Sequence, residues 1–86
     1  MRILVVEDEA KVASFIRKGL EEEGYAVDVA PDGDTGLAMG LDRVHDLILL
    51  DVHLPGRNGF SVLRELRDKQ VATPVLLLTV RATIED

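Results

Sequence analysis

Cysteine is absent from the 86-residue chain, and aromatic residues make up only 3% of it. Without cysteine the chain forms neither a disulfide nor a thiolate metal site, as we expect of a cytoplasmic protein. The aromatic side chains Phe15, Tyr25 and Phe60 are too few to predict a platform on which nucleic-acid bases stack. The composition therefore predicts one small domain that depends on an aliphatic core.

Positive charge and long apolar runs are also scarce. The chain carries 10 Lys and Arg residues against 16 Asp and Glu residues, for a formal net charge of -6. Nucleic-acid phosphates repel such an acidic surface, so we expect no direct contact of this segment with nucleic acid. The apolar run at residues 3–6 is short and acids follow it at once. We therefore expect no signal peptide, no transmembrane span and no membrane partner.

Two short apolar runs end in carboxylates. Residues 3–6 precede Glu7 and Asp8, and residues 47–50 precede Asp51. Fully apolar runs of this length are typical of parallel strands that are buried on both faces. Because the carboxyl ends of such strands meet at one crevice, we expect the three acids to converge there. Such a cluster predicts a site for a hard cation, with one acid available as a nucleophile.

A simpler interpretation of the acids stays open at this point. Glu7 and Asp8 could be a solvated pair before the next helix, where acids are favourable, and Asp51 could be a turn residue. However, unit charges about 4 Å apart repel by roughly 4 kcal/mol at an effective dielectric of 20. A fold that gathers three carboxylates therefore requires a cation or a raised pKa. Thr79 ends a further apolar run and is expected at the same crevice.

Strand and helix patterns alternate along the chain. With short connections, this alternation predicts an α/β fold with a parallel sheet and right-handed crossovers. The second strand contains Asp28 and is expected at an edge. Strands are expected at residues 3–6, 25–30, 47–51 and 75–79, and helices at residues 10–23, 35–41 and 60–69. The predicted inward stripes are Val12, Phe15, Ile16 and Leu20 on the first helix, and Phe60, Leu63 and Leu66 on the third.

The end of the chain departs from a complete pattern. Residues 83–86, Thr-Ile-Glu-Asp, predict a helix start capped by Thr83, and the chain stops within the first turn of that helix. Residues 75–78 are apolar on both faces, as in a central strand, but no sequence remains to pair beside them. We therefore expect residues 1–86 to form a single domain that is truncated at its C-terminal end.

Three motifs together resemble the receiver domain of bacterial two-component response regulators. They are Leu-Val-Val-Glu-Asp-Glu from residue 4, Leu-Ile-Leu-Leu-Asp-Val-His-Leu-Pro-Gly-Arg-Asn-Gly-Phe from residue 47, and Pro-Val-Leu-Leu-Leu-Thr-Val-Arg from residue 74. The chain is most similar to regulators of the OmpR/PhoB type, which carry a C-terminal winged-helix domain, and more loosely to heavy-metal-responsive members. The resemblance implies a flavodoxin-like, three-layer α/β/α fold with strand order 2-1-3-4, lacking the fifth strand and last helix.

The resemblance also implies a role for each site residue. Asp51 would accept a phosphoryl group from a sensor histidine kinase. Asp8 and Asp51 would bind Mg²⁺ directly and Glu7 mostly through water, while the backbone carbonyl of His53 would be a further ligand. Thr79 would bind a phosphoryl oxygen and move inward on phosphorylation. The parent protein would be a switch rather than an enzyme, and it would reach DNA through its C-terminal domain.

The sequence departs from the family pattern at several positions. The phosphate-binding Lys at the end of the family's fifth strand has no counterpart, because we expect no fifth strand in this chain. Lys69 is no substitute, since it precedes the fourth strand and lies at the opposite end of the sheet. Val80 replaces the usual Ala and would narrow access to the phosphoacceptor. His53 and Arg81 occupy positions that tune dephosphorylation in the family, and the side chain of His53 is expected to face solvent. His45 is expected on the surface.

Two other functions remain open. A Mg²⁺-dependent phosphatase would use Asp51 as its nucleophile, but haloacid-dehalogenase-like enzymes have a second Asp where His53 stands here. A phosphorylation-incompetent module would keep the fold for binding or dimerisation, which the missing Lys and Val80 favour and the intact acid cluster opposes. We also expect a homodimer through residues 75–78, whose backbone groups would lie open at a sheet edge.

Overall fold

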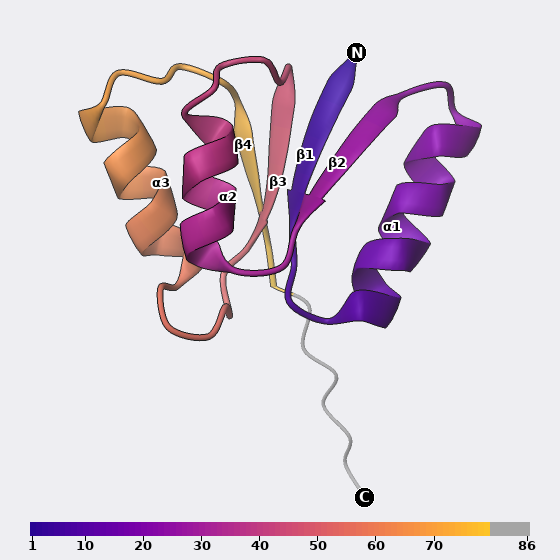
Figure 1. The fold of residues 1–86 in the computed structure, drawn as a ribbon, viewed down its shortest axis with the longest axis horizontal. Helices are drawn as coiled ribbons and strands as arrows, with labels where there is room; N and C mark the ends of the chain where they lie inside the picture. The colour runs from indigo at the N-terminus through magenta and orange to yellow at the C-terminus, as the bar shows by residue number, and fades with distance from the viewer. Residues whose placement is uncertain (80–86) are drawn as a thin grey trace, which may run out of the picture.

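Residues 1–79 are described by a computed structural model, in which a four-stranded parallel sheet lies between helices (Figure 1). The strand order is β2-β1-β3-β4, which confirms the predicted flavodoxin-like order 2-1-3-4. The strands are β1 (Arg2–Val6), β2 (Ala26–Ala30), β3 (Leu47–Asp51) and β4 (Val75–Leu78). The helices are α1 (Ala10–Glu22), α2 (Gly33–Gly40) and α3 (Gly59–Asp68).

The two central strands, β1 and β3, are buried on both faces of the sheet. On one face Leu4 and Ile48 pack with the residues of α2 and α3, and on the other face Ile3 and Val5 pack with residues of α1. Burial of an aliphatic side chain of this size contributes about 1.5–3 kcal/mol. The apolar runs that predicted these strands therefore supply the core on both sides of the sheet at once.

The two faces of the sheet are covered unequally within the described residues. Helices α2 and α3 lie together on one face, and α1 lies on the other face, against β1 and β2 (Figure 1). The half of that second face formed by β3 and β4 is more open, and Leu76 in β4 is 55% exposed. Strand β2 forms one edge of the sheet, as predicted, and β4 forms the other within residues 1–79.

Helix α1 buries part of the stripe that the sequence predicted, since Ile16 and Leu20 pack against the core as expected. Its inward side carries Ala13, which is buried, with Ile16 and Leu20 packed against the core. Phe15 is 80% exposed, so its predicted inward position is wrong. At about 100° per residue, Phe15 lies roughly 130° around the helix from the centre of the buried face. The apolar character of Phe15 suggested burial, but the geometry of the helix excludes it.

Helix α3 packs Leu63 and Leu66 into the core, as predicted, but it turns Phe60 away from the core. It buries Gly59, Val62 and Leu66, whereas Phe60 is 55% exposed and was wrongly assigned to the core. A Cβ on Gly59 would overlap the carbonyl oxygen of Asp51, so only glycine permits this close approach. The contact at Gly59 sets the rotation of the helix, and Phe60 consequently faces solvent.

His45, expected on the surface, is buried at the amino-terminal edge of the sheet. Its Nε2 atom lies 2.8 Å from Oδ2 of Asp28, which also accepts a hydrogen bond of 2.8 Å from Nε of Arg2. The hydrogen bond from Arg2, followed by that from His45, lowers the pKa of the Asp28 carboxyl below its ordinary value. These side chains link β1, β2 and the segment before β3.

Several predictions concern residues outside the described part of the chain. They are the helix start capped by Thr83 and the effects of Val80 and Arg81. Within the described part, no helix combines the length and the apolar character needed to cross a membrane.

The close packing of α2 on β1 leads to a prediction for two helical glycines. A Cβ on Gly36 would lie 2.7 Å from Cγ1 of Val6, whereas a Cβ on Gly19 in α1 would meet no atom within 4 Å in the described structure. We expect Gly36→Ala to lower the free energy of unfolding by about 1–3 kcal/mol through overpacking. Gly19→Ala should raise it by about 0.5–1 kcal/mol through helix propensity. Urea unfolding measures both, and equal changes would contradict the packing of α2.

Candidate functional site

The sheet register brings the three acids of the sequence prediction together. Val6 pairs with Leu50, so Glu7 and Asp51 are neighbours at the carboxyl edge of the sheet. Oxygen atoms of Glu7, Asp8 and Asp51 all lie within 4.8 Å of one another. The predicted convergence of the carboxylates at one crevice is therefore confirmed.

Two of these carboxylates are buried and only partly hydrogen-bonded. Asp51 is 3% exposed, and its Oδ1 accepts a hydrogen bond of 3.0 Å from the backbone N–H of His53. Glu7 is 2% exposed, and its Oε2 accepts from the N–H of Glu9 at 3.0 Å. The second oxygen of Glu7, Oε1, is buried without a hydrogen-bond partner among residues 1–79. A buried acceptor in this state is costly unless a proton or a cation reaches it.

The environment of Glu7 changes its acidity. Burial raises the pKa of the Glu7 carboxyl from 4.5 to about 7, and the nearby charges of Asp51 and Asp8 add to this shift. The hydrogen bond from the Glu9 amide opposes the shift but does not cancel it. Near neutral pH, the Glu7 carboxyl is therefore partly protonated and partly ionised unless a cation binds.

The donor set fits a hard divalent cation. Carboxylate oxygens are the ligands that Mg²⁺ takes in proteins, usually with several waters retained, and the exposed Asp8 leaves room for water. The unpartnered oxygen of Glu7 points to the same conclusion. The side chain of His53 is exposed, as predicted. Thr79 is exposed one residue beyond Leu78, the residue that pairs with Asp51.

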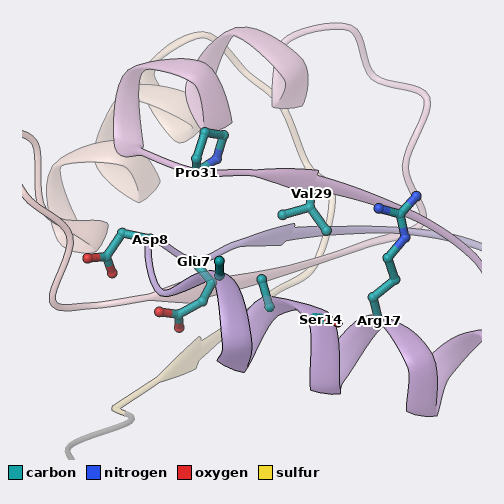
Figure 2. A pocket seen from close by; sticks show the side chains of 8 residues that line it. Glu7, Asp8, Ser14, Arg17, Val29 and Pro31 are labelled. Atoms are coloured by element: carbon teal, nitrogen blue, oxygen red, sulfur yellow. The ribbon is translucent and has the colours of Figure 1, made fainter.

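A pocket lies between the acid cluster and α1. Figure 2 shows it between α1 and the end of β2, with Glu7 and Asp8 at one end and Arg17 at the other. Its volume is about 260 Å³. Its lining residues are Glu7, Asp8, Ala10, Ala13, Ser14, Arg17, Val29 and Pro31. Asp51 does not line this pocket, so the pocket gives access to the cluster on the side of Glu7 and Asp8.

The segment between β3 and α3 is more regular than the sequence suggested. Asn58 and Gly59 lie outside the helix predicted at residues 60–69, but Gly59 begins α3 and Asn58 caps it by accepting from the N–H of Ser61 at 2.9 Å. The N–H of Gly59 donates to the carbonyl of Val52 at 3.0 Å. An Asn before an apolar helical pattern is a helix-start signal that could have identified this cap.

Comparison with known proteins gives a consistent result for the whole chain. The family described as the response regulator receiver domain matches residues 3–86. The transcriptional regulatory protein DltR of Streptococcus agalactiae is 46% identical over 86 residues, which are 100% of this chain and 38% of DltR. The transcriptional activator protein IrlR of Burkholderia pseudomallei is 50% identical over 86 residues, which are 100% of this chain and 37% of IrlR.

Solved structures agree with the fold. The receiver domain of the Francisella response regulator 1452 has a TM-score of 0.88 and 34% identity, over 95% of this chain and 68% of that chain. The response regulator TrrA of Thermotoga maritima, solved in complex with Mg(2+)-BeF, has a TM-score of 0.87 and 37% identity, over 94% of this chain and 70% of that chain. The chain thus spans well under half of its curated relatives and about two thirds of these solved chains.

The buried carboxyl of Glu7 leads to a prediction about pH and stability. The pKa of Glu7 is raised from 4.5 to about 7 in the folded chain. The contribution of Glu7 to the free energy of unfolding is therefore largest below pH 4.5 and is lost as pH rises through 7. A shift of this size corresponds to about 3 kcal/mol at most. In the presence of a chelator, Glu7→Gln should therefore be more stable than the wild type at about pH 8.5 and nearly equal at about pH 4.

Urea unfolding across this pH range measures the difference between the two chains. Glu22→Gln removes an exposed carboxyl from α1 and controls for the change in net charge. Parallel pH profiles for the wild type and Glu7→Gln would show that the burial of Glu7 does not govern its ionisation.

Proposed function

Because the chain belongs to the family of response regulator receiver domains, we propose that Asp51 is its phosphoacceptor. The observation that carries this proposal is the buried Asp51 carboxylate, oriented by one backbone N–H and placed beside two further acids. The phosphoryl donor is a phosphohistidine of a sensor histidine kinase. The chain thereby acts as the receiving half of a two-component signalling pair.

The transfer is a single displacement at phosphorus. A carboxylate oxygen of Asp51 attacks, the P–N bond of the phosphohistidine breaks, and the electron pair of that bond stays on the imidazole nitrogen. The products are an acyl phosphate on Asp51 and a free imidazole. We assign the attack to Oδ2, because the N–H of His53 already donates to Oδ1. The fixed Oδ1 orients the carboxylate for in-line attack.

Glu7, Asp8 and Asp51 are the residues that would hold Mg²⁺, with the backbone carbonyl of His53 as a further ligand. When bound, Mg²⁺ neutralises the charge that the acids and the phosphoryl oxygens bring together. The unpartnered Oε1 of Glu7 and the mutual proximity of the acid oxygens support this assignment. The structure of TrrA in complex with Mg(2+)-BeF supports it by analogy.

Thr79 is proposed as the residue that responds to the phosphoryl group. It follows β4, whose Leu78 pairs with Asp51, and its side chain is exposed. Its hydroxyl can donate to a phosphoryl oxygen at the same edge of the sheet. An inward movement of Thr79 would then couple the phosphorylation of Asp51 to a change in the position of the end of β4.

The output lies in a longer protein. The curated relatives include transcriptional regulatory proteins, of which this chain spans 33–38%. We propose that the parent protein acts in the cytoplasm and contacts DNA through a C-terminal domain. The receiver itself holds the phosphoryl group rather than turning over a substrate. A Mg²⁺-dependent phosphatase is the alternative that predicts turnover.

We propose that the 86-residue chain self-associates along β4. Within residues 1–79, β4 pairs with β3 on one side, so its other side presents open backbone groups. Leu76 is 55% exposed on the face that α1 covers only over β1 and β2. Exposed apolar edge strands pair readily with other chains. A second copy of the chain is therefore the occupant that we assign to this edge.

The phosphoacceptor role leads to a labelling prediction. Acetyl phosphate with Mg²⁺ should add one phosphoryl group to the wild type and none to Asp51→Asn, as measured by mass spectrometry of the intact chain. Asp8→Ala should lose both the labelling and the rise in melting temperature that Mg²⁺ produces through mass action. A lasting adduct supports a receiver, whereas steady release of phosphate supports the phosphatase.

The result also separates the binding module from the receiver. A wild-type chain that binds Mg²⁺ but gains no phosphoryl group would favour a module that has lost the switch. If Asp51→Asn is labelled as efficiently as the wild type, then Asp51 is not the phosphoacceptor.

The proposed association leads to a prediction for two equally exposed side chains. Leu76 in β4 and Phe60 in α3 are each 55% exposed. At tens of micromolar, light scattering should give a dimer for the wild type and for Phe60→Lys, and a monomer for Leu76→Lys. A charged side chain on an edge strand opposes pairing with another edge. A monodisperse wild-type monomer would contradict self-association along β4.

A further inference from the structure

Arg57 joins the segment of residues 52–58, which follows the phosphoacceptor strand, to two helices. Its Nε lies 3.2 Å from Oδ1 of Asp34 in the first turn of α2, and its Nη1 lies 3.0 Å from Oε1 of Glu65 in α3. The guanidinium group is a planar fork, so one side chain holds both carboxylates at the same time. Arg57 is only 30% exposed, and its geometry is that of a clasp between α2 and α3.

The backbone of the same segment contacts the first residues of both helices. A Cβ on Gly33, where α2 begins, would overlap the carbonyl oxygen of Arg57. A Cβ on Gly59, where α3 begins, would lie 2.9 Å from the Cα of Val52, the first residue of the segment. Gly56, with φ 74°, supplies the bend between these contacts. The packing of Gly59 against Val52 thus holds the segment at α3. The ion pairs of Arg57 hold the part of the segment that lies beside Gly33.

The position of this segment determines the surroundings of Asp51. The N–H that donates to Oδ1 of Asp51 belongs to His53, whose own side chain is exposed to solvent. The placement of that N–H therefore depends on the segment as a whole. A shift of the segment would lengthen this hydrogen bond and turn the carboxylate away from the line of attack.

We propose that Arg57 is a positioning residue for phosphoryl transfer, because its pairs with Asp34 and Glu65 hold the segment that orients Asp51. The inference rests on the proposed role of Asp51 as phosphoacceptor. Exposed ion pairs contribute little to global stability. Small errors in the placement of reacting groups, by contrast, reduce rates strongly. The effect of Arg57 should therefore be found in the rate of labelling rather than in folding.

The first test compares rates of Asp51 labelling by acetyl phosphate at saturating Mg²⁺. Arg57→Ala should lower the maximal rate about three- to tenfold, with the donor concentration for half-maximal rate and the melting temperature little changed. The maximal rate of Arg57→Lys should lie between the rates of the wild type and Arg57→Ala, because an ammonium group keeps the charge but lacks the planar fork that binds both carboxylates. Arg64→Ala removes an exposed arginine of α3 that has no ion pair within residues 1–79, and it should match the wild type.

The second test removes the partners of Arg57. In a chain carrying Asp34→Asn and Glu65→Gln, Arg57→Ala should cause no further loss of rate, since the pairs are already absent. Hydrogen exchange of the His53 amide should be faster in Arg57→Ala than in Arg64→Ala. The amides of Val62 and Leu66 should exchange equally in both.

The outcomes distinguish the inference from the function on which it rests. If the wild type is not labelled at Asp51, the proposed function fails, and His53 exchange alone decides whether Arg57 holds the segment. If the wild type is labelled and Arg57→Ala is labelled equally fast, the inference is wrong while the function stands. The inference is also wrong if Arg57→Ala lowers the labelling rate further in the chain that carries Asp34→Asn and Glu65→Gln. It is equally wrong if Arg57→Ala leaves the hydrogen exchange of the His53 amide unchanged.

Discussion

Repulsion between the carboxylates at the carboxyl edge of the sheet is the constraint around which the rest of the structure is arranged. The parallel register of β1 and β3 leaves Glu7 and Asp51 no alternative to close approach, since Val6 and Leu50 are paired partners. The same apolar residues that drive the strands together therefore also force the acids together. The fold resolves this conflict only by raising the pKa of Glu7 or by admitting a cation.

The connection after β3 shows how one small residue positions several groups. Gly59 allows α3 to begin against the backbone of Asp51 and Val52, with a Cβ position only 2.9 Å from the Cα of Val52. This contact fixes one end of the segment of residues 52–58, whose His53 N–H donates to Asp51. It also fixes the rotation of α3, so Phe60 is exposed. Site geometry and helix packing are consequently set by the same contact.

The sequence predicted what depends on local pattern and on strand order. Runs of apolar residues with acids at their ends were sufficient to place Glu7, Asp8 and Asp51 together, because parallel strands share one carboxyl edge. It did not predict the burial of His45, whose partner Asp28 is 17 residues away in sequence. It also failed for Phe15, because the size of an apolar side chain does not report which side of a helix the sheet covers. The roles of Thr79 and the His53 carbonyl stay predictions.

The carboxylates at the two ends of the sheet differ in whether basic side chains lie beside them. At the amino edge, Asp28 is met by the guanidinium of Arg2 and the ring of His45. At the carboxyl edge, no ion pair within residues 1–79 involves the three clustered acids. The chain thus neutralises the half-buried carboxylate of Asp28 with its own side chains. The acids gathered at the carboxyl edge have no such basic partner among residues 1–79, and this difference is the observation on which the proposed Mg²⁺ site rests.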